Sequence, residues 1–410
     1  MVKIVISLVA LTLLNIVNAK NNRTFPEDFM FGTGTSAYQT EGAWNIDGKS
    51  ENIWDHWVHS DPTHIKNNDT ADVATHYYES YLSSLVELHG LRIKHFRFSI
   101  PWTRILPTGF ANEINLKAIM HYQKFLEFLW LYEIIPVVTL YYHDLPQSLQ
   151  DIGGWTNPEV VKYFTDYARI CFQYFTGIDY WITFNDPAAI CRKGYGDGTF
   201  APGIKSDGVG KVSIAIDVKY SEAASEEHLD AVGLYTNPIY KGNWPDTVIE
   251  RVAFRSKSEN LTKSRLPEFT KEEIDYINGT SDFMSVNLYH THLVEDVEEA
   301  EFWDPSYMKD MKAKVYLNSS WTIAENGQAI VPLSARKALI WMYYVYNPSE
   351  ILITENGVPD SELYSDNTRI EYYRDYLNAV LDAILIDRVK IIGYTAWSFI
   401  DGFEWTEGYR

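Results

Sequence analysis

The amino-acid sequence predicts an α/β protein in which eight parallel strands and their helices form a (β/α)8 barrel, the TIM-barrel fold. Eight apolar runs alternate with segments of helical spacing, as repeated βα units do. The chain has 410 residues, enough for one large barrel or two ordinary domains. It contains no low-complexity tract, charge block or Pro/Ser-rich linker after residue 24. We therefore expect one barrel domain over residues 20–410.

The eight runs are the predicted barrel strands. They are rich in Val, Ile, Phe, Tyr and Thr, which is typical of parallel strands buried on both faces. In chain order they are Phe31–Gln39, His95–Ile100, Ile134–Tyr142, Tyr180–Asn185, Val212–Asp217, Phe283–His290, Ile351–Glu355 and Lys390–Phe399.

Helical patterns fill most of the connections. Asp72–His89 begins with an acidic residue and ends before Gly90, and Asn115–Trp130 has apolar residues at helical spacing. A third helix is expected from Asn157-Pro158 to Phe175, because proline is favourable in the first turn.

Two connections have no predicted helix. Ala188–Lys211 is rich in Gly and contains Pro202, so it is expected to be a loop after the fourth strand. Few residues follow Phe399, which leaves no room for an eighth helix. The sequence thus predicts a barrel without the helices after strands 4 and 8, incomplete at its C-terminus.

Composition narrows the class of ligand. Hydrophobic residues make up 46% and charged residues 22%, as in ordinary globular proteins with a core. The net charge of −20 repels nucleic-acid phosphates and anionic lipids, so we expect neither a nucleic-acid nor a membrane partner. Aromatic residues reach 15%. Most of them fit core packing, but flat rings also pack on the apolar faces of sugars. Composition does not determine the oligomeric state.

The N-terminus has the pattern of a secretory signal peptide over residues 1–19. Lys3 precedes the apolar segment Ile4–Val17, and Val17-Asn18-Ala19 is suited to cleavage. We expect a secreted protein, extracellular or in a gut lumen. Glycosylation sequons, Asn-x-Ser/Thr, agree with this route. They begin at Asn22, Asn68, Asn260, Asn278 and Asn318.

The chain has two cysteines, Cys171 and Cys191. In an oxidising compartment they could pair, and two buried free thiols are an equally good interpretation. Two cysteines are too few for a zinc site of the usual kind. We expect no metal and no cofactor.

Two predicted strands end in a carboxylate. The fourth run leads to Asn185-Asp186, and the seventh leads to Glu355. Barrel active sites lie at the C-terminal ends of the strands, and glycoside hydrolysis requires two carboxylates facing one cavity. A single carboxylate at a strand end is more often a cap or a salt-bridge partner. A pair on strands that converge on one cavity makes a glycosidase site about as good an interpretation.

Ordered motifs at strand ends make the chain similar to glycoside hydrolase family 1, which includes β-glucosidases and myrosinases. The motifs run nearly from end to end of the chain. They are Phe31–Trp44, Phe96–Arg104, Trp181–Pro187, Ile353–Gly357 and Trp397–Trp405.

The resemblance implies a role for each matching residue in the retaining hydrolysis of a small-molecule β-glycoside. Glu355 would be the nucleophile, Arg97 would lie beneath it and keep it ionised, and Tyr289 would hydrogen-bond the same carboxylate. Trp397 would form the floor of the sugar site. The hydroxyls of glucose would be bound by Gln39, Asn185, Glu404 and Trp405.

Three features depart from the family pattern. Asp186 stands where the family has its acid/base Glu, which withdraws the carboxyl by about 1.5 Å if the backbone is unchanged. Tyr142 takes the position of a sugar-binding His, and His143 that of a Trp. The third departure is the pair of missing helical segments.

These departures leave alternatives open. The chain is expected to be a β-glucosidase that acts on O- or S-linked glucosides, and thioglucosides have leaving groups good enough to make the acid dispensable. The alternative is a catalytically impaired or inactive family member that binds carbohydrate or protein, or an incomplete gene product. The aglycone is set by loop side chains that these motifs do not include.

Overall fold

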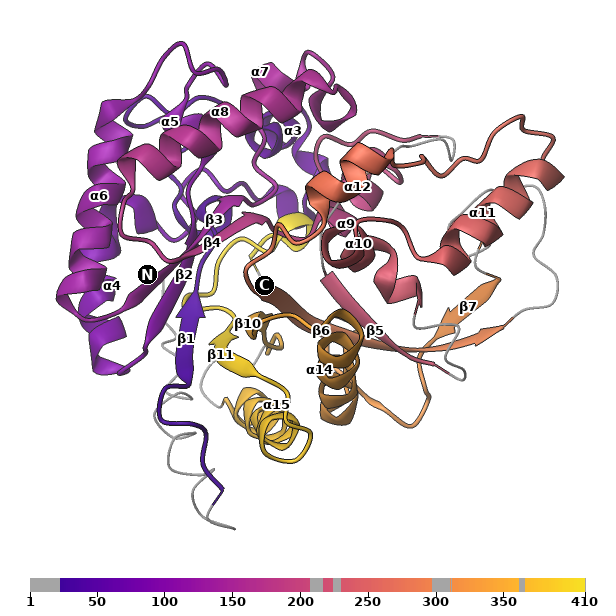
Figure 1. Cartoon of the computed structure of the whole chain (residues 1–410). Helices are drawn as coiled ribbons and strands as arrows, with labels where there is room; N and C mark the ends of the chain where they lie inside the picture. Colours follow the sequence, from indigo (N-terminus) through magenta and orange to yellow (C-terminus); the bar gives the residue numbers. More distant parts are fainter. Residues whose placement is uncertain are drawn as a thin grey trace. The chain divides into compact units, whose positions relative to one another are not determined.

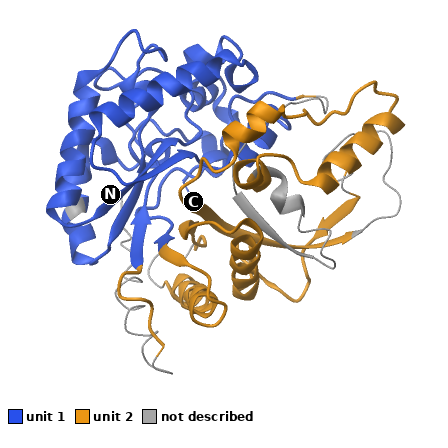
Figure 2. Cartoon of the chain, in the orientation of Figure 1, with its two compact units in different colours: residues 1–10, 30–205, 394–410 blue, residues 11–29, 206–393 orange. Residues whose placement is uncertain are grey.

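A computed structural model of the chain describes residues 23–206, 217–223, 230–296, 310, 312–360 and 366–409 (Figure 1). The chain divides into two compact units, each described here by itself (Figure 2). The first unit contains residues 30–205 and 394–410, together with residues 1–10. The second contains residues 11–29 and 206–393. The predicted signal peptide lies outside the described residues.

The first unit is built on parallel strands in the order β4-β3-β2-β1-β11. Registers such as Gly32↔His95 and His95↔Ile135 align the C-terminal ends of neighbouring strands. The strands are β1 (Met30–Gly34), β2 (His95–Ser99), β3 (Ile135–Tyr141), β4 (Tyr180–Phe184) and β11 (Ile391–Ala396), whose last three residues belong to this unit.

Three long helices accompany these strands: α4 (Tyr77–Gly90), α6 (Leu116–Leu131) and α8 (Glu159–Tyr174). The Asn115 side chain caps α6 by accepting from the Ala118 amide, and α6 packs on β3 (Figure 1). The apolar face of α6 contributes Ile119, Phe125 and Leu129 to the core. Short helices lie in the connections: α2 (Ala37–Thr40), α3 (Ile53–Ser60), α5 (Trp102–Ile105) and α7 (Gln147–Gln150).

The second unit has parallel strands in the order β10-β6-β5, with β7 antiparallel to β6. The strands are β5 (Asp217–Ala223), β6 (Met284–Asp296), β7 (Ala313–Tyr316) and β10 (Ile351–Asn356), beside a small hairpin of β8 (Thr322–Ile323) and β9 (Ala329–Ile330). The helices are α10 (Asp230–Lys241), α11 (Asp246–Ser258), α12 (Lys271–Ile277), α14 (Pro332–Tyr346) and α15 (Asn367–Leu385).

The strands β2, β3, β4 and β10 agree with the predicted runs within two residues, and the other predicted strands need correction. Strand β6 continues past the predicted end at His290 to Asp296, because its last residues pair with β7, and β11 ends at Ala396 and not at Phe399. The run Phe31–Gln39 is strand only to Gly34, because the chain turns into α2 at Ala37. The fifth strand begins at Asp217, where the predicted run Val212–Asp217 ends, and 212–216 lie outside the described residues. Helix α4 begins at Tyr77 and not at Asp72, because His76 adopts a left-handed backbone with φ of 59°.

The two connections without a predicted helix contain short turns. After β4 the chain forms α9 (Pro187–Ala189) and a π-helical turn, η5 (Ile190–Gly194), so this part of the predicted loop is helical. In the described residues 188–206 there is no helix as long as α6 or α8. After β11, residues 397–409 contain a single 3-10 turn, η7 (Trp405–Glu407).

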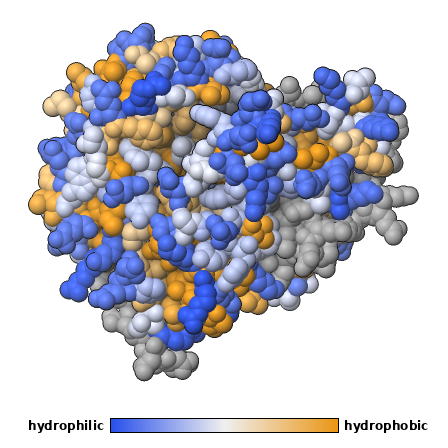
Figure 3. Space-filling model, in the orientation of Figure 1, coloured by the Kyte–Doolittle hydropathy of each residue, from blue (hydrophilic) through white to orange (hydrophobic). Residues whose placement is uncertain are grey.

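The exposure of particular residues bears on the predictions about glycosylation, disulfide pairing and membrane contact. Asn68, Asn260 and Asn278 are exposed, and the fourth described sequon residue, Asn318, is half-buried. Cys171 and Cys191 are buried free thiols, which is the second of the two interpretations that the sequence left open. None of the helices in the described part of the chain is long and apolar enough to cross a membrane. Figure 3 shows small apolar patches scattered over a largely hydrophilic face.

Candidate active site

The predicted site residues fall into two groups. Glu355 and Tyr289 belong to the second unit. The others belong to the first unit: Gln39, Arg97, Tyr142, His143, Asn185, Asp186, Trp397, Glu404 and Trp405. The geometry within each group follows.

Glu355 lies at a β-bulge near the end of β10. Ile353 pairs with Val286 and Glu355 pairs with Asn287, so Thr354 is an extra residue on its strand. Bulges redirect side chains and are common beside active sites. Thr354 Oγ1 donates to Asn287 Oδ1 at 2.7 Å, which fixes the irregular register.

The Glu355 carboxylate is buried and hydrogen-bonded from the neighbouring strand. Its residue is 4% exposed, and Tyr289 Oη donates to Glu355 Oε2 at 3.0 Å. A buried carboxylate is costly unless it accepts hydrogen bonds. The phenol on β6 therefore stabilises the carboxylate and sets its direction, as the resemblance implied.

The residues after Glu355 are fixed as well. Asn356 Nδ2 donates to the Leu288 carbonyl and, at 2.8 Å, to Tyr372 Oη. Gln328 Nε2 donates to the Gly357 carbonyl at 3.2 Å. The sequence analysis missed Tyr372 and Gln328, and no local signal marks them, since both come from distant segments.

Arg97 on β2 is 1% exposed and orients Asn185. Its Nη2 donates to Asn185 Oδ1 at 2.8 Å, and its Nε donates to Thr139 Oγ1 at 3.3 Å. The Asn185 backbone N–H also donates to the Tyr141 carbonyl at 2.9 Å. Thr139 was missed, although a threonine inside an otherwise apolar buried strand is a usable signal.

Asp186 caps the short helix that follows β4. Its φ is 36°, in the left-handed region, and its Oδ1 accepts from the Ala189 amide at 2.9 Å. Asp is among the best N-cap residues, and Pro187 takes the first helical position, where proline is favoured. The half-buried carboxylate in the predicted acid/base position therefore also serves its own backbone.

An aromatic group surrounds the ends of β3 and β11. The Tyr142 ring is parallel to Trp397 (centroids 5.8 Å apart, planes at 8°) and to Trp405 (6.1 Å, 7°). The Arg97 guanidinium carbon lies 5.5 Å from the ring centroids of both Tyr142 and Trp397. The structure thus brings together three residues that the sequence placed at the sugar.

His143 is neutral in this setting. Burial lowers its pKa to about 3, and the positive charge of Lys193 adds to that effect. Its ring contacts Trp405 edge-on with centroids 5.2 Å apart. It therefore acts as an aromatic wall for Trp405 and does not exchange protons near neutral pH.

Gln39 is held by the segment after β11. Its Nε2 donates to the Phe403 carbonyl at 3.0 Å, and its Oε1 accepts from Ser36 Oγ at 2.7 Å. The Phe403 amide donates back to the Gln39 carbonyl at 2.9 Å. These two hydrogen bonds between Gln39 and Phe403 position Gln39 and also Glu404, the residue after Phe403. The Glu404 backbone amide donates to the Gly408 carbonyl at 2.7 Å.

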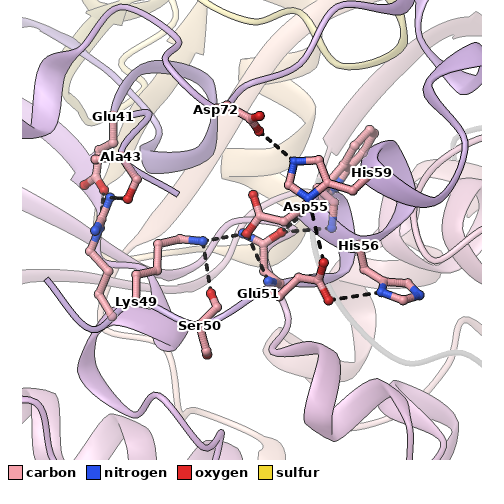
Figure 4. Close-up of polar contacts among 12 residues, drawn as sticks. Glu41, Ala43, Lys49, Ser50, Glu51, Asp55, His56, His59 and Asp72 are labelled. Atoms are coloured by element: carbon pink, nitrogen blue, oxygen red, sulfur yellow. Dashed lines mark hydrogen bonds and ion pairs between the residues drawn. The ribbon is translucent and has the colours of Figure 1, made fainter. Parts of the chain in front are cut away.

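A buried polar network supports the segment that carries Gln39. Arg104 Nε donates to Glu41 Oε2 at 2.7 Å, and Tyr122 Oη donates to Glu41 Oε1 at 2.5 Å. Lys49 lies 2.5 Å from the Asp55 carboxylate (Figure 4). These ion pairs are almost fully buried, so losing one partner would leave an uncompensated charge.

Asp144 lines a small pocket beside this network, together with Glu41, Lys49 and Asn52. Burial raises the pKa of the Asp144 carboxyl to about 7. Its Oδ1 accepts from the Tyr142 amide at 3.3 Å, which ties the end of β3 to this region. In the described part of the chain, no group of three or more His, Cys, Asp or Glu residues could hold a metal ion.

Three predicted site residues have left-handed backbones. The φ angles are 36° at Asp186, 67° at His143 and 54° at Trp405. Such conformations are disfavoured for residues with a Cβ, and they concentrate at functional sites. Residues outside the predicted site, such as His76 and Asn260, share this backbone, so the conformation by itself does not mark the site.

Comparison with known proteins gives the family of this chain. The model of glycosyl hydrolase family 1 matches residues 21–231 and 211–410. Myrosinase 1 of Brevicoryne brassicae is 38% identical over 428 residues, covering 94% of this chain and 91% of the relative. Human cytosolic beta-glucosidase is 33% identical, with 94% and 91% covered.

Solved structures agree with the sequence relatives. Aphid myrosinase superposes with a TM-score of 0.87 at 37% identity, covering 94% of this chain and 92% of that one. The rice Os3BGlu6 beta-glucosidase gives a TM-score of 0.85 at 30% identity, with the same coverage. These likenesses confirm the predicted (β/α)8 fold class.

Proposed function

Because the chain belongs to glycosyl hydrolase family 1 and is a glycoside hydrolase, we propose that it cleaves β-glucosides by a retaining double displacement with Glu355 as nucleophile. The observation that carries the proposal is the Glu355 carboxylate itself. It is buried at a bulged strand end and accepts a hydrogen bond from Tyr289 at 3.0 Å. A carboxylate with fixed direction suits attack on a carbon.

The proposed first step forms a bond between a Glu355 oxygen and the anomeric carbon while the bond to the leaving oxygen or sulfur breaks. Asp186 gives its proton to the leaving atom. In the second step water attacks the anomeric carbon, Asp186 takes the water proton, and Glu355 leaves as a carboxylate. The products are a β-configured sugar and the free alcohol or thiol.

The remaining site residues would bind the sugar. Arg97 orients Asn185 through a 2.8 Å hydrogen bond, which prepares that amide for a hydroxyl. Trp397 and Trp405 are half-buried and offer flat apolar faces. The Gln39 side chain is held by the Phe403 carbonyl, and Glu404 is held by the bond from its backbone amide to the Gly408 carbonyl. Polar groups beside flat rings suit the mixed surface of glucose.

A fluorinated glucoside with a good leaving group tests the nucleophile. It forms a glycosyl-enzyme that hydrolyses slowly, so mass spectrometry of the digested protein locates the label. We expect the label on Glu355 and none in a Glu355→Gln variant. A label on another carboxylate contradicts the assignment, and no label in the parent favours the second candidate below.

The second candidate is a barrel that binds glucosides with little turnover. The capping contact of Asp186 favours it, because a carboxylate held by the Ala189 amide is drawn back from a leaving group. The relative named Myrosinase 1 favours an intermediate form, in which thioglucosides are cleaved with little need for an acid. The turnover of an S-linked glucoside and of an alkyl O-linked glucoside distinguishes these forms. Turnover of the S-linked glucoside alone supports the intermediate form, and turnover of neither supports the binding barrel.

We also propose that the chain is secreted and glycosylated. The N-terminal pattern and the exposed Asn68, Asn260 and Asn278 support this. Expression in a eukaryotic secretory host should give a product in the medium that begins near Lys20 and loses mass on treatment with an N-glycosidase. Retention of residues 1–19 in an intracellular product contradicts the proposal.

A further inference from the structure

The Tyr142 ring stacks on Trp397 and Trp405, the two indoles proposed to bind the sugar. It is parallel to Trp397 within 8° and to Trp405 within 7°, at centroid separations of 5.8 and 6.1 Å. Offset parallel stacking at such separations is the favourable arrangement for aromatic pairs. All three residues belong to the first unit, so the stack is defined within one compact body.

Exposure differs within the stack. Tyr142 is 4% exposed, whereas Trp397 and Trp405 are both half-buried. The two indoles therefore keep accessible surface, and the faces turned to Tyr142 are covered by the protein's own side chain. Those covered faces are apolar and flat, as required for packing against a pyranose.

The Tyr142 backbone is anchored by neighbours that do not depend on its ring. Its amide donates to Asp144 Oδ1 at 3.3 Å, and it directly follows the buried strand β3. Rotation about χ1 could therefore move the ring while β3 stays in place. The Arg97 guanidinium, 5.5 Å from the centroids of both Tyr142 and Trp397, can remain beside the indole when the phenol leaves.

We infer that Tyr142 is an internal occupant of the sugar-binding surface. In the free protein it covers the aromatic faces that a glucoside covers in the complex, and binding requires the ring to turn away. This inference rests on the proposed function, which assigns Trp397 and Trp405 to the sugar. It changes the role expected for residue 142 from a sugar ligand to a competitor that sets affinity.

The competition has a measurable size. Each favourable aromatic pair contributes about two- to twelve-fold to an equilibrium constant, and Tyr142 forms two such pairs. Removing the ring should therefore tighten sugar binding by about 5- to 150-fold. A residue that only contributed a wall or a hydrogen bond to the sugar would give the opposite sign on removal.

The test is isothermal titration of the secreted full chain with methyl C-β-glucoside, which has no glycosidic oxygen and cannot be hydrolysed. We expect Tyr142→Ala and Tyr142→Val, which both lack a ring, to lower Kd, and Tyr142→Phe to give no tightening because its ring remains. Phe172→Ala is the matched control. It removes an exposed ring that packs edge-on against Trp181, outside the site, and should leave Kd unchanged.

Weaker binding by both Tyr142→Ala and Tyr142→Val overturns the inference and leaves the proposed function intact. Tighter binding without labelling of Glu355 supports the inference and contradicts the proposed nucleophile. Absence of binding in the parent and in both ring-free variants overturns the inference, because uncovering the indoles should then reveal binding. Tyr142→Val, which removes less volume, provides the readout if the alanine variant does not fold.

Discussion

The ends of β10 and β4 carry the two proposed catalytic carboxylates and hold them in different ways. At β10 the Glu355 carboxylate accepts from Tyr289, a side chain on the neighbouring strand. At β4 the Asp186 carboxylate accepts from Ala189, three residues further along its own chain. A carboxylate held by another strand projects away from its own backbone, whereas a capping carboxylate bends back toward it.

The contrast shows how the one methylene by which Asp is shorter than Glu changes what the carboxylate at position 186 can contact. Asp is short enough to cap a helix from the left-handed backbone at position 186, and Glu is seldom found in that role. The same shortness reduces its reach toward a leaving group. The proposed roles therefore use the Glu355 carboxylate for chemistry alone and divide the Asp186 carboxylate between chemistry and the capping contact with Ala189.

The largest expected effect breaks the β10 end. Glu355→Gln keeps the size of the side chain and removes the nucleophile, so turnover should fall by about 10³-fold or more. The matched control is Glu350→Gln, which removes a carboxylate from the Lys390 ion pair just before the same strand. A Glu355→Gln enzyme with more than a tenth of parental kcat would show that another group attacks the sugar.

A smaller effect is expected from restoring reach at the β4 end. Alkyl glucosides need protonation of the leaving oxygen and nitrophenyl glucosides need little, so their kcat/KM ratio reports acid catalysis. Asp186→Glu should narrow that ratio by about 10²-fold. Asp197→Glu is the control, since Asp197 also accepts from its own backbone, at Thr199. Equal ratios in parent and Asp186→Glu would mean that reach does not limit the reaction.

The support of Glu355 gives the next effect. Tyr289→Phe removes the 3.0 Å hydrogen bond to the carboxylate, and a hydrogen bond to a charged group is worth about 10- to 100-fold in an equilibrium. We expect kcat to fall by about tenfold with little change in KM. Tyr276→Phe, at a residue 83% exposed, should change neither constant. A change confined to KM would place Tyr289 in substrate binding instead.

The smallest expected effect isolates the cap. Asp186→Ala should lower the free energy of unfolding by about 1 kcal/mol, while Asp186→Asn should not, because Asn caps as well as Asp. Urea unfolding of both variants beside the parent makes the comparison. Equal stability in all three would mean that the Ala189 contact contributes nothing to folding, and the β4 carboxylate would then be available for chemistry alone.

The strands could be predicted because their signal is local. β2 and β3 are continuous runs of buried residues, and their ends lie within one residue of the predicted ones. The end of β1 was predicted five residues too late, because no proline or charged residue in 35–39 marks the turn into α2. Helix α9 was missed inside a Gly-rich segment, although Asp186-Pro187 is a recognisable start.

The site could be predicted as a set of residues and not as an arrangement. The motifs named Glu355, Tyr289, Arg97 and Asn185, and the structure shows the Tyr289–Glu355 and Arg97–Asn185 pairs. The parallel packing of Tyr142 with Trp397 and Trp405 was not foreseen. It joins residues 142, 397 and 405, and ring orientation depends on tertiary contacts that no local pattern encodes.

The reciprocal hydrogen bonds between Gln39 and Phe403 have a consequence for mutational tolerance. A Cβ at Gly402 would lie 2.6 Å from the Gln39 carbonyl oxygen, so the two segments can approach only where the chain has no side chain. At position 403 both bonds use main-chain atoms, whereas at position 39 one of them uses the Gln39 side chain. A saturation scan should therefore find position 402 restricted to glycine, while the exposed position 401 accepts several residues. The close approach of these two segments therefore depends on position 402 having a hydrogen atom where every other residue has a Cβ.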